Sequence, residues 1–276
     1  MSVVLGILSA AQENMYKRTE SERYTPGILC ADDPAPVDWV NRDSETAMLL
    51  LCEHAGNVLP NGHELLGLSY EQVNSHIGWD IGAAAVARKL ATLLQAPLIL
   101  QRYSRLLIDC NRPLDAEDSI PVSSDGISIP ANFELSDGEK QARQSEIFKP
   151  LDRAINEGLA KVKRRAAFSI HSFTPQLHDQ QPRPWHAGFL TRTDHDTGNA
   201  LIREIKRRKP DLRLVLNEPY SIDDESDWFI PRYAESRGLT HCLIEIRNDQ
   251  LLHNSSVNEW ADLLASAINA LMEQSA

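Results

Sequence analysis

The stretch that decides the fold runs from residue 49 to residue 60 and reads Leu-Leu-Leu-Cys-Glu-His-Ala-Gly-Asn-Val-Leu-Pro. Its apolar beginning has the length of a strand that is buried on both faces. Gly56, Asn57 and Pro60 are residue types that end strands, so we expect His54 at the carboxyl end of this one. Ligands of open α/β sheets bind at that end. Taken alone, His54 is either a functional group or a hydrogen-bonded structural histidine.

The composition is that of a globular protein. The 276 residues suffice for one large domain or two small ones, and 42% hydrophobic with 24% charged residues excludes a disordered or fibrous chain. The 28 basic and 39 acidic residues give a net charge of -11. This charge argues against nucleic acid or an anionic membrane as the main partner. An anionic ligand would have to be held by locally placed arginines.

Cysteine usage and the lack of long apolar runs favour a cytoplasmic protein. The apolar start at residues 2–11 has no basic region before it, so we do not predict a signal peptide. No run approaches the roughly 18 apolar residues that span a bilayer. The cysteines have no CxxC spacing and are predicted to be reduced, buried and inert: Cys30, Cys52, Cys110 and Cys242.

Apolar runs alternate with segments of helical periodicity along the chain. Strands are predicted at residues 47–53, 97–100, 106–110, 167–170, 212–216 and 241–246. Helices are predicted at residues 77–95, 136–165, 196–208, 233–237 and 256–272. This alternation predicts a mostly parallel sheet with helices on both faces. No linker divides the chain, so we expect one domain over residues 1–276, in which residues 1–45 are an N-terminal extension packed on the core.

Some local features have a structural explanation. Ser136 and Glu139 have capping-box spacing at the start of the second predicted helix, which is expected to break or restart at Pro150. Asp80 falls in the first turn of the first predicted helix, where an acid complements the helix dipole. The irregular stretch at 115–135 is long enough to be a lid or a binding loop.

Groups that carry chemistry stand at or near the ends of four predicted strands: His54, Asn111 with Arg112, His171, and Glu245. One such strand end would mean little. Four strand ends in one sheet would place these groups along a single rim, which is what a site assembled from several loops requires.

These residue types suit a catalytic zinc site. Two neutral imidazoles and one carboxylate, with a fourth position left for water, are a catalytic zinc ligand set. His54 and His171 supply the imidazoles, Asp80 is chosen as the carboxylate, and His76 is a rival close to it in sequence. Glu245 then serves as general base on the water and as proton donor to the leaving nitrogen. Nearby arginines would hold a substrate carboxylate through forked hydrogen bonds.

Other catalytic machinery finds less support. The sequence has no GxSxG elbow, no Walker loop and no GxGxxG after a strand. A metal-free serine hydrolase would need a nucleophile beside a histidine. Ser172 is next to His171 in sequence, but neighbours on a strand face opposite sides of the sheet.

At these residues the sequence resembles the N-formylglutamate amidohydrolase family of zinc carboxypeptidase-like hydrolases. The resemblance covers roughly residues 47–253, and its most specific part is the Ser-Arg…Asp-x-Asn-Arg block at residues 104–112. It rests on these segments: Glu53-His54-Ala55-Gly56 with Pro60, and residues 76–82, 103–113, 170–173 and 245–248.

The resemblance implies a three-layer α/β fold around a mixed, mainly parallel sheet. It also implies one zinc ion per chain and hydrolysis of the amide of an N-acyl amino acid or small peptide-like substrate with a free carboxylate, such as N-formylglutamate. The metal ligands would be His54, Asp80 and His171, and the general base would be Glu245. The HxxE pair of carboxypeptidases is absent, since His54 is followed by Ala-Gly-Asn.

The resemblance also implies a clamp for the substrate carboxylate. Asn111 and Arg112 match this clamp, and Arg105 and Arg183 are further candidates for contact with an anion. An alternative from another functional class is a non-catalytic binding protein on the same fold, which would use Arg112 to hold a carboxylated small molecule. Both alternatives expect a small-molecule partner and no nucleic acid or membrane.

Overall fold

A seven-stranded sheet forms the centre of the protein in a computed structural model that describes residues 27–274. The strand order is β1-β3-β2-β6-β9-β7-β8. Among the described residues, this sheet has six strand pairings, and four of them are parallel. The antiparallel pairings are β1 with β3 and β7 with β9. The strands are Val37–Val40 (β1), Met48–Cys52 (β2), Leu98–Gln101 (β3), Ala166–Phe173 (β6), Ala187–Leu190 (β7), Leu214–Leu216 (β8) and Thr240–Arg247 (β9), and Ser123–Ser124 (β4) with Ile127–Ser128 (β5) forms a separate hairpin.

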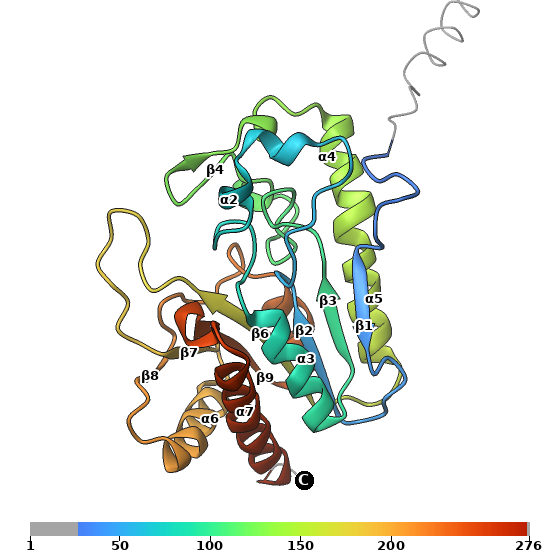
Figure 1. Cartoon of the computed structure of the whole chain (residues 1–276). Helices are drawn as coiled ribbons and strands as arrows, with labels where there is room; N and C mark the ends of the chain where they lie inside the picture. The colour runs from blue at the N-terminus through green and yellow to red at the C-terminus, as the bar shows by residue number, and fades with distance from the viewer. Residues whose placement is uncertain (1–26, 275–276) are drawn as a thin grey trace, which may run out of the picture.

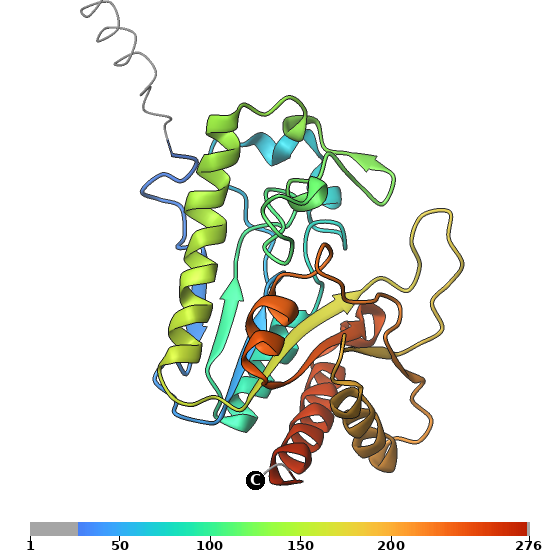
Figure 2. The same ribbon diagram turned by 180° about the vertical axis from the view of Figure 1, so that it is seen from behind.

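Helices cover both faces of the sheet and complete three layers (Figures 1 and 2). One face is covered by α3, α6 and α7, and the other by α5 together with the helical turns at residues 230–237. The helices are Tyr70–Val73 (α2), Ala83–Leu94 (α3), Asp137–Arg143 (α4), Lys149–Ala160 (α5), His195–Arg208 (α6) and Asn254–Gln274 (α7). Short helical turns are Glu64–Gly67, Glu117–Ser119, Pro130–Asn132, Gln144–Phe148, Ile230–Ala234, Glu235–Arg237 and Asn248–Leu251. The expected fold class is therefore confirmed.

In the described part of the chain, no helix combines the length and the apolarity needed to cross a membrane.

The strand β2 explains why the core has two halves. All five of its residues are buried, and their side chains alternate between the faces of the sheet. Leu50 and Cys52 belong to the apolar cluster under α3, α6 and α7, whereas Leu49 and Leu51 belong to the cluster under α5. Each fully buried leucine contributes about 1.5–3 kcal/mol. Burial on both faces accounts for the continuous apolar run in the sequence.

The predicted strand at residues 106–110 is wrong, because this segment forms tight turns. Side chains satisfy its backbone in place of a neighbouring strand. Asn132 Nδ2 donates to the carbonyl of Leu106 at 2.7 Å, and Arg143 Nη1 donates to that of Leu107 at 2.8 Å. Leu106 and Leu107 are fully buried all the same. The apolar run correctly indicated burial, but a short run does not specify a strand.

The helix predicted from residue 77 begins later, at Ala83 (α3). Gly82 precedes it with φ +85°, a left-handed conformation that glycine adopts readily and that ends the helix on its N-terminal side. Asp80 therefore lies before the helix, not in its first turn as predicted. Its N–H donates to the carbonyl of His54 at 3.0 Å, so the segment is held by β2.

The capping box at residues 136–139 is confirmed. Ser136 Oγ accepts from the N–H of Glu139, and the Glu139 carboxylate accepts from the N–H of Ser136 at 2.9 Å. The helix does not break at Pro150. Instead α4 continues into α5 through a π-helical turn, and Pro150 is the second residue of α5. The helix ends at Ala160, before the predicted residue 165.

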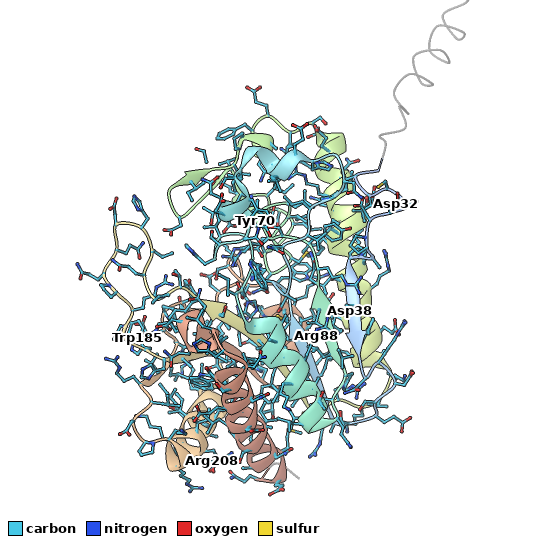
Figure 3. All side chains as sticks on the ribbon, in the orientation of Figure 1. Asp32, Asp38, Tyr70, Arg88, Trp185 and Arg208 are labelled. Atoms are coloured by element: carbon cyan, nitrogen blue, oxygen red, sulfur yellow. The ribbon has the colours of Figure 1, made fainter. Side chains whose placement is uncertain are left out.

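The sheet contains two strands that we did not predict, β1 and β7. β1 lies inside the expected N-terminal extension and pairs with β3 as an antiparallel edge strand. Its Asp38 contacts Arg88 of α3 at 2.5 Å, and the two side chains lie beside each other in Figure 3. The apolar start and the rest of the extension up to residue 26 fall outside the described residues.

The cysteines divide into two groups. Cys52, Cys110 and Cys242 are buried and unpaired, as predicted, and burial raises the pKa of each thiol. Cys30 is exposed, which contradicts the prediction that it is buried. It lies in the segment that precedes β1, where its neighbours Ile28 and Leu29 pack against the half of the core under α5.

Candidate metal and catalytic site

The segments that form the site meet at the carboxyl end of β2. His54 follows this strand, and Asp80 is attached to it by the hydrogen bond from its N–H to the His54 carbonyl. His171 lies within the neighbouring strand β6, which extends to residue 173. The N–H of Ser172 donates to Asp80 Oδ2 at 3.2 Å and so fixes the acid against β6.

A glycine permits the turn that follows His54. A side chain at Gly56 would place its Cβ 2.2 Å from the carbonyl oxygen of Arg102. Only glycine allows the backbone to pass so close. The punctuation seen in the sequence thus has a steric cause, and it directs the chain away from the sheet directly after His54.

His54, Asp80 and His171 form a buried cluster that could hold a metal ion. One ligand atom from each residue lies within 4.8 Å of the others. Asp80 Oδ2 is 2.7 Å from His171 Nδ1 and 3.5 Å from His54 Nδ1. The two imidazole rings meet edge to face at a centroid distance of 4.9 Å. His54 Nδ1 is buried without a hydrogen-bond partner, as expected for a nitrogen that binds something else. The donor set of two nitrogens and one oxygen fits a zinc ion.

The other nitrogen of each imidazole is held by a second carboxylate. His54 Nε2 lies 2.7 Å from Asp109 Oδ1, and His171 Nε2 lies 3.0 Å from Glu53 Oε2. Histidines that bind metals usually donate their second ring N–H to such a partner, which fixes the tautomer and the ring orientation. Both rings are therefore oriented with Nδ1 toward the cluster.

Charge compensation keeps the acids of the cluster ionised. Burial opposes ionisation of Asp80, but His54 and His171 lower the pKa of its carboxyl below the ordinary value. Burial likewise opposes ionisation of Asp109, yet Arg105 and His54 lower the pKa of this carboxyl well below its usual range. Arg105 pairs with Asp109 at 2.7 Å and lies 3.6 Å from Asp80.

The pKa values of the two imidazoles are shifted in the complementary direction. Burial disfavours their charged forms, but the neighbouring carboxylates raise the pKa of His54 above its ordinary value and that of His171 well above it. The neighbouring carboxylates thus favour protonation of both rings when no metal is bound. A divalent cation would supply the same positive charge on displacing these protons, so the site fits a metal on charge as well as on geometry.

Glu245 faces the cluster from the next strand. It lies opposite His171 in the register of β6 and β9, and its side chain lines the same cavity. Its Oε2 is buried without a hydrogen-bond partner. Burial, assisted by the charge of Asp80 and opposed by His171, raises the pKa of Glu245 to about 7. An unpaired carboxylate that titrates near neutrality is suited to general acid–base chemistry.

A cavity of about 440 Å³ connects these groups, within the usual range for small-molecule sites. It is bordered on one side by the cluster and Glu245. The remaining wall comes from the turns after β3, from the segment between β8 and β9, and from Leu190 of β7 and Leu243 of β9. The turns and the segment contribute Arg105, Asn111, Arg112, Pro219, Tyr220, Ser221, Ile222, Asp223, Ser226 and Asp227, and Ser172 lies beside the cluster.

Asn111 borders the cavity, but its side-chain amide is occupied. Its Nδ2 donates to Asp227 Oδ2 at 2.9 Å, and its Oδ1 accepts from the N–H groups of Trp228 and Phe229 at 3.2 and 3.3 Å. Burial raises the pKa of Asp227 to about 7. Asn111 thus anchors the segment at residues 227–229 against the site.

The two remaining arginines differ in their positions. Arg112 lines the cavity, where its Nε pairs with Asp118 at 2.8 Å and its Nη1 donates to the carbonyl of Ser226. Arg183 does not line it. It lies behind Tyr220, donates to the phenol oxygen at 2.9 Å and places its guanidinium 5.0 Å from the ring centroid.

Sequence reasoning assigned no role in the site to three of its acids. Asp109 stood inside the block that carries the resemblance, so its proximity to Asn111 and Arg112 was a usable signal. The side chain of Glu53 continues the alternation of β2 and lies on the same face of the sheet as His171. Only the pairing of β2 with β6 reveals this. Asp227 had no signal. The rival His76 lies with Asp125 at 2.9 Å and does not belong to the metal cluster.

Comparisons with known proteins show which family and fold the chain resembles. The profile of the N-formylglutamate amidohydrolase family matches residues 46–252. A gene product of Agrobacterium tumefaciens of known crystal structure is 32% identical, with a TM-score of 0.83 over 90% of this chain and 100% of that one. The N-formylglutamate amidohydrolase from Ralstonia eutropha JMP134 is 18% identical and shares the fold, with a TM-score of 0.66 over 87% of this chain and 98% of that one.

No curated protein matches the sequence. The family profile nevertheless spans most of the chain, including every residue of the buried cluster and Glu245. The chain therefore belongs to the N-formylglutamate amidohydrolase family.

Proposed function

We propose that the protein is a zinc-dependent amidohydrolase that cleaves the amide bond of an N-acyl amino acid with a free carboxylate, such as an N-formyl amino acid. Its family is one of amidohydrolases, which act on small molecules. The observation that carries the proposal is the convergence of His54 Nδ1, His171 Nδ1 and Asp80 Oδ2 beside the unpaired carboxylate of Glu245 in one cavity.

His54, Asp80 and His171 would hold the zinc ion. When bound, zinc lowers the pKa of a coordinated water to roughly 7 and polarises a carbonyl oxygen. Their imidazoles are already fixed by Asp109 and Glu53, so metal binding requires little rearrangement of these side chains.

Glu245 would carry the proton transfers. Its carboxylate takes a proton from the attacking water as the new C–O bond forms at the amide carbon. It then delivers this proton to the amide nitrogen as the C–N bond breaks, which leaves the acid and the free amine as products. Burial and the missing hydrogen-bond partner of Oε2 leave this carboxylate free for both steps.

Arginines at the cavity wall would bind the substrate carboxylate. Arg112 reaches the cavity from the segment after Asp109, and Arg105 reaches it beside the cluster. Guanidinium groups form charge-assisted, forked hydrogen bonds with carboxylates. Asn111 supports this wall through its bonds to residues 227–229.

Metal content and one substitution test the proposal. We expect about one zinc ion per chain in the purified protein and loss of hydrolysis after chelation, with recovery on adding zinc. Glu245→Gln should keep the metal and lose at least about 10²-fold in kcat, the lower range for a general acid–base residue. A screen of N-formyl, N-acetyl, N-carbamoyl and dipeptide substrates identifies the acyl group.

The results separate the proposal from its alternative. A carboxylate-binding protein without catalysis would hydrolyse none of these substrates and would bind a carboxylated ligand equally well with and without chelator. Full activity of Glu245→Gln would remove Glu245 from the mechanism. Activity that is unchanged by chelation in metal-free buffer would reject the role of zinc.

A further inference from the structure

The position of Glu53 follows from the pairing of β2 with β6. Leu51 lies opposite Ser169 in this parallel register, so the next residue on the same face after Leu51, Glu53, comes level with His171. Ser169 and His171 are two apart on β6 and therefore share a face of the sheet. The fold thus places the Glu53 carboxylate beside both side chains.

The contacts of Glu53 hold it against His171. Its Oε2 accepts from Ser169 Oγ at 2.5 Å and lies 3.0 Å from His171 Nε2, while its Oε1 has no hydrogen-bond partner. Glu53 is 1% exposed. A carboxylate at this depth is costly unless it is paired, and a hydrophobic residue would suit the surrounding core better. Its pairing with His171 points to a role in orienting the histidine.

We propose that Glu53 is a positioning residue that keeps the N–H of His171 on Nε2 and directs Nδ1 toward the metal. The inference rests on the proposed metal site. Nδ1 is the atom of His171 that joins Asp80 and His54 in the cluster, and Glu53 occupies the opposite nitrogen of the same ring. The negative charge of Glu53 also makes the imidazole a stronger donor to a cation.

Glu53 tests this role more cleanly than Asp109 does. Asp109 holds His54 in the corresponding way, but it also pairs with Arg105 at 2.7 Å, so its removal would disturb the cavity wall. Among the described residues, the ion pair of Glu53 is with His171. A change at Glu53 therefore acts on the histidine and on the small Ser169 hydroxyl.

The experiment compares metal binding by full-length wild type, Glu53→Gln and Ser169→Ala. The zinc dissociation constant is measured by competition with a coloured chelator, and cobalt(II) is bound to record its visible absorption spectrum. Removing such a partner weakens metal binding by about 10–100-fold, so we expect about tenfold for Glu53→Gln, with an altered cobalt spectrum. Ser169→Ala, which only loosens the carboxylate, should give a smaller change in the same direction.

The control is Glu235→Gln, the same change beside another buried histidine. Glu235 lies 3.7 Å from His241 at the opposite end of β9, away from the cluster. Its zinc affinity should equal that of wild type. The inference is overturned if Glu53→Gln loses zinc affinity by threefold or less and keeps an unchanged cobalt spectrum. In that case the proposed function still stands, provided that the wild type binds zinc. If Glu53→Gln does not fold, Ser169→Ala decides instead: a loss of zinc affinity of twofold or less, with an unchanged cobalt spectrum, overturns the inference. Wild type that binds no zinc overturns the proposed function instead.

Discussion

The two nitrogens of each imidazole in the cluster face different carboxylates, and this difference defines the site. Asp109 and Glu53 take the Nε2 atoms, and Asp80 lies between the Nδ1 atoms. A structural histidine would be satisfied by one such pairing. His54 Nδ1 makes no hydrogen bond and lies 3.5 Å from Asp80 Oδ2, a geometry that suits a ligand position.

Glu245 gives a prediction about the stability of the metal-free protein. In the unfolded chain its carboxyl has an ordinary pKa near 4.5, and in the folded protein the pKa is about 7. Below pH 4.5 the carboxyl is neutral in both states. As pH rises to 7, only the unfolded chain releases the proton, so the folded state loses stability. Above pH 7 the burial of the ionised carboxylate lowers the free energy of unfolding by its full amount, on the order of 1–3 kcal/mol.

Metal-free Glu245→Gln avoids this cost. We expect its free energy of unfolding at pH 8 to exceed that of wild type by on the order of 1–3 kcal/mol, with the difference vanishing near pH 4.5. Urea denaturation in the presence of chelator at both pH values measures it. Equal stability of the two proteins at pH 8 would show that the buried carboxylate carries no such strain.

At the scale of elements, the strands that lie deepest were the most predictable. β2, β6 and β9 are apolar runs buried on both faces, and each was expected within a few residues. Periodicity could not identify the edge strand β1 or the four-residue β7, because short strands carry little pattern. Residues 106–110 were misread because side chains of Asn132 and Arg143, far along the sequence, satisfy the backbone there.

The same limit applies to the candidate site. The sequence predicted His54, His171 and Glu245 at strand ends along one rim of the sheet, and the structure brings them together with Asp80. Arg183 was named as a further anion contact beside the clamp implied by the resemblance, and it lies behind Tyr220 instead of lining the cavity. Which arginine reaches a cavity depends on loop packing, and loop packing leaves no periodic signal.

The different positions of Arg112 and Arg183 therefore allow a prediction about which of them binds the substrate carboxylate. Arg112→Ala should lower kcat/KM by about 10–100-fold, mainly through KM, because one or two charge-assisted hydrogen bonds of about 1.5–3 kcal/mol are lost. Arg183→Ala removes contacts with Tyr220, Thr174 and Phe173 outside the cavity and should change kcat/KM by less than about tenfold. Steady-state kinetics on the best substrate of the screen measures both.

A substrate analogue supplies the control for this pair. For an analogue in which an amide replaces the carboxylate, Arg112→Ala and wild type should differ little, since the missing charge removes the contact from both. A larger loss for Arg183→Ala than for Arg112→Ala would assign the carboxylate to the outer arginine.

At the scale of the whole molecule, the sheet topology concentrates the chemistry at one end. β2, β3, β6 and β9 run parallel, so their carboxyl ends meet at the same edge, and the antiparallel β1 closes one side of the sheet. The long connections from β2 to α3 and from β3 to α4 extend beyond this edge and form the upper part of the molecule in Figure 1. The helices protect both faces of the sheet and leave this edge to the site.

The metal ligands come from separate parts of this architecture, so metal binding should stabilise the whole fold. His54 follows β2, Asp80 precedes α3 and His171 lies in β6. A ligand that binds only the folded state adds about 4 kcal/mol at a thousandfold excess over its dissociation constant. For a chain of this size, this free energy corresponds to a rise in Tm of roughly 8 °C.

Thermal unfolding of chelator-treated protein, with and without added zinc, measures this rise. His54→Ala removes one ligand and should show a much smaller shift, while Glu235→Gln, whose carboxylate lies at the other end of β9, should respond as wild type does. A zinc-induced rise of equal size in His54→Ala would mean that the ion binds elsewhere on the chain. In that case the buried cluster would be stabilised by its protons alone, and the hydrolytic mechanism would need a different source for its activated water.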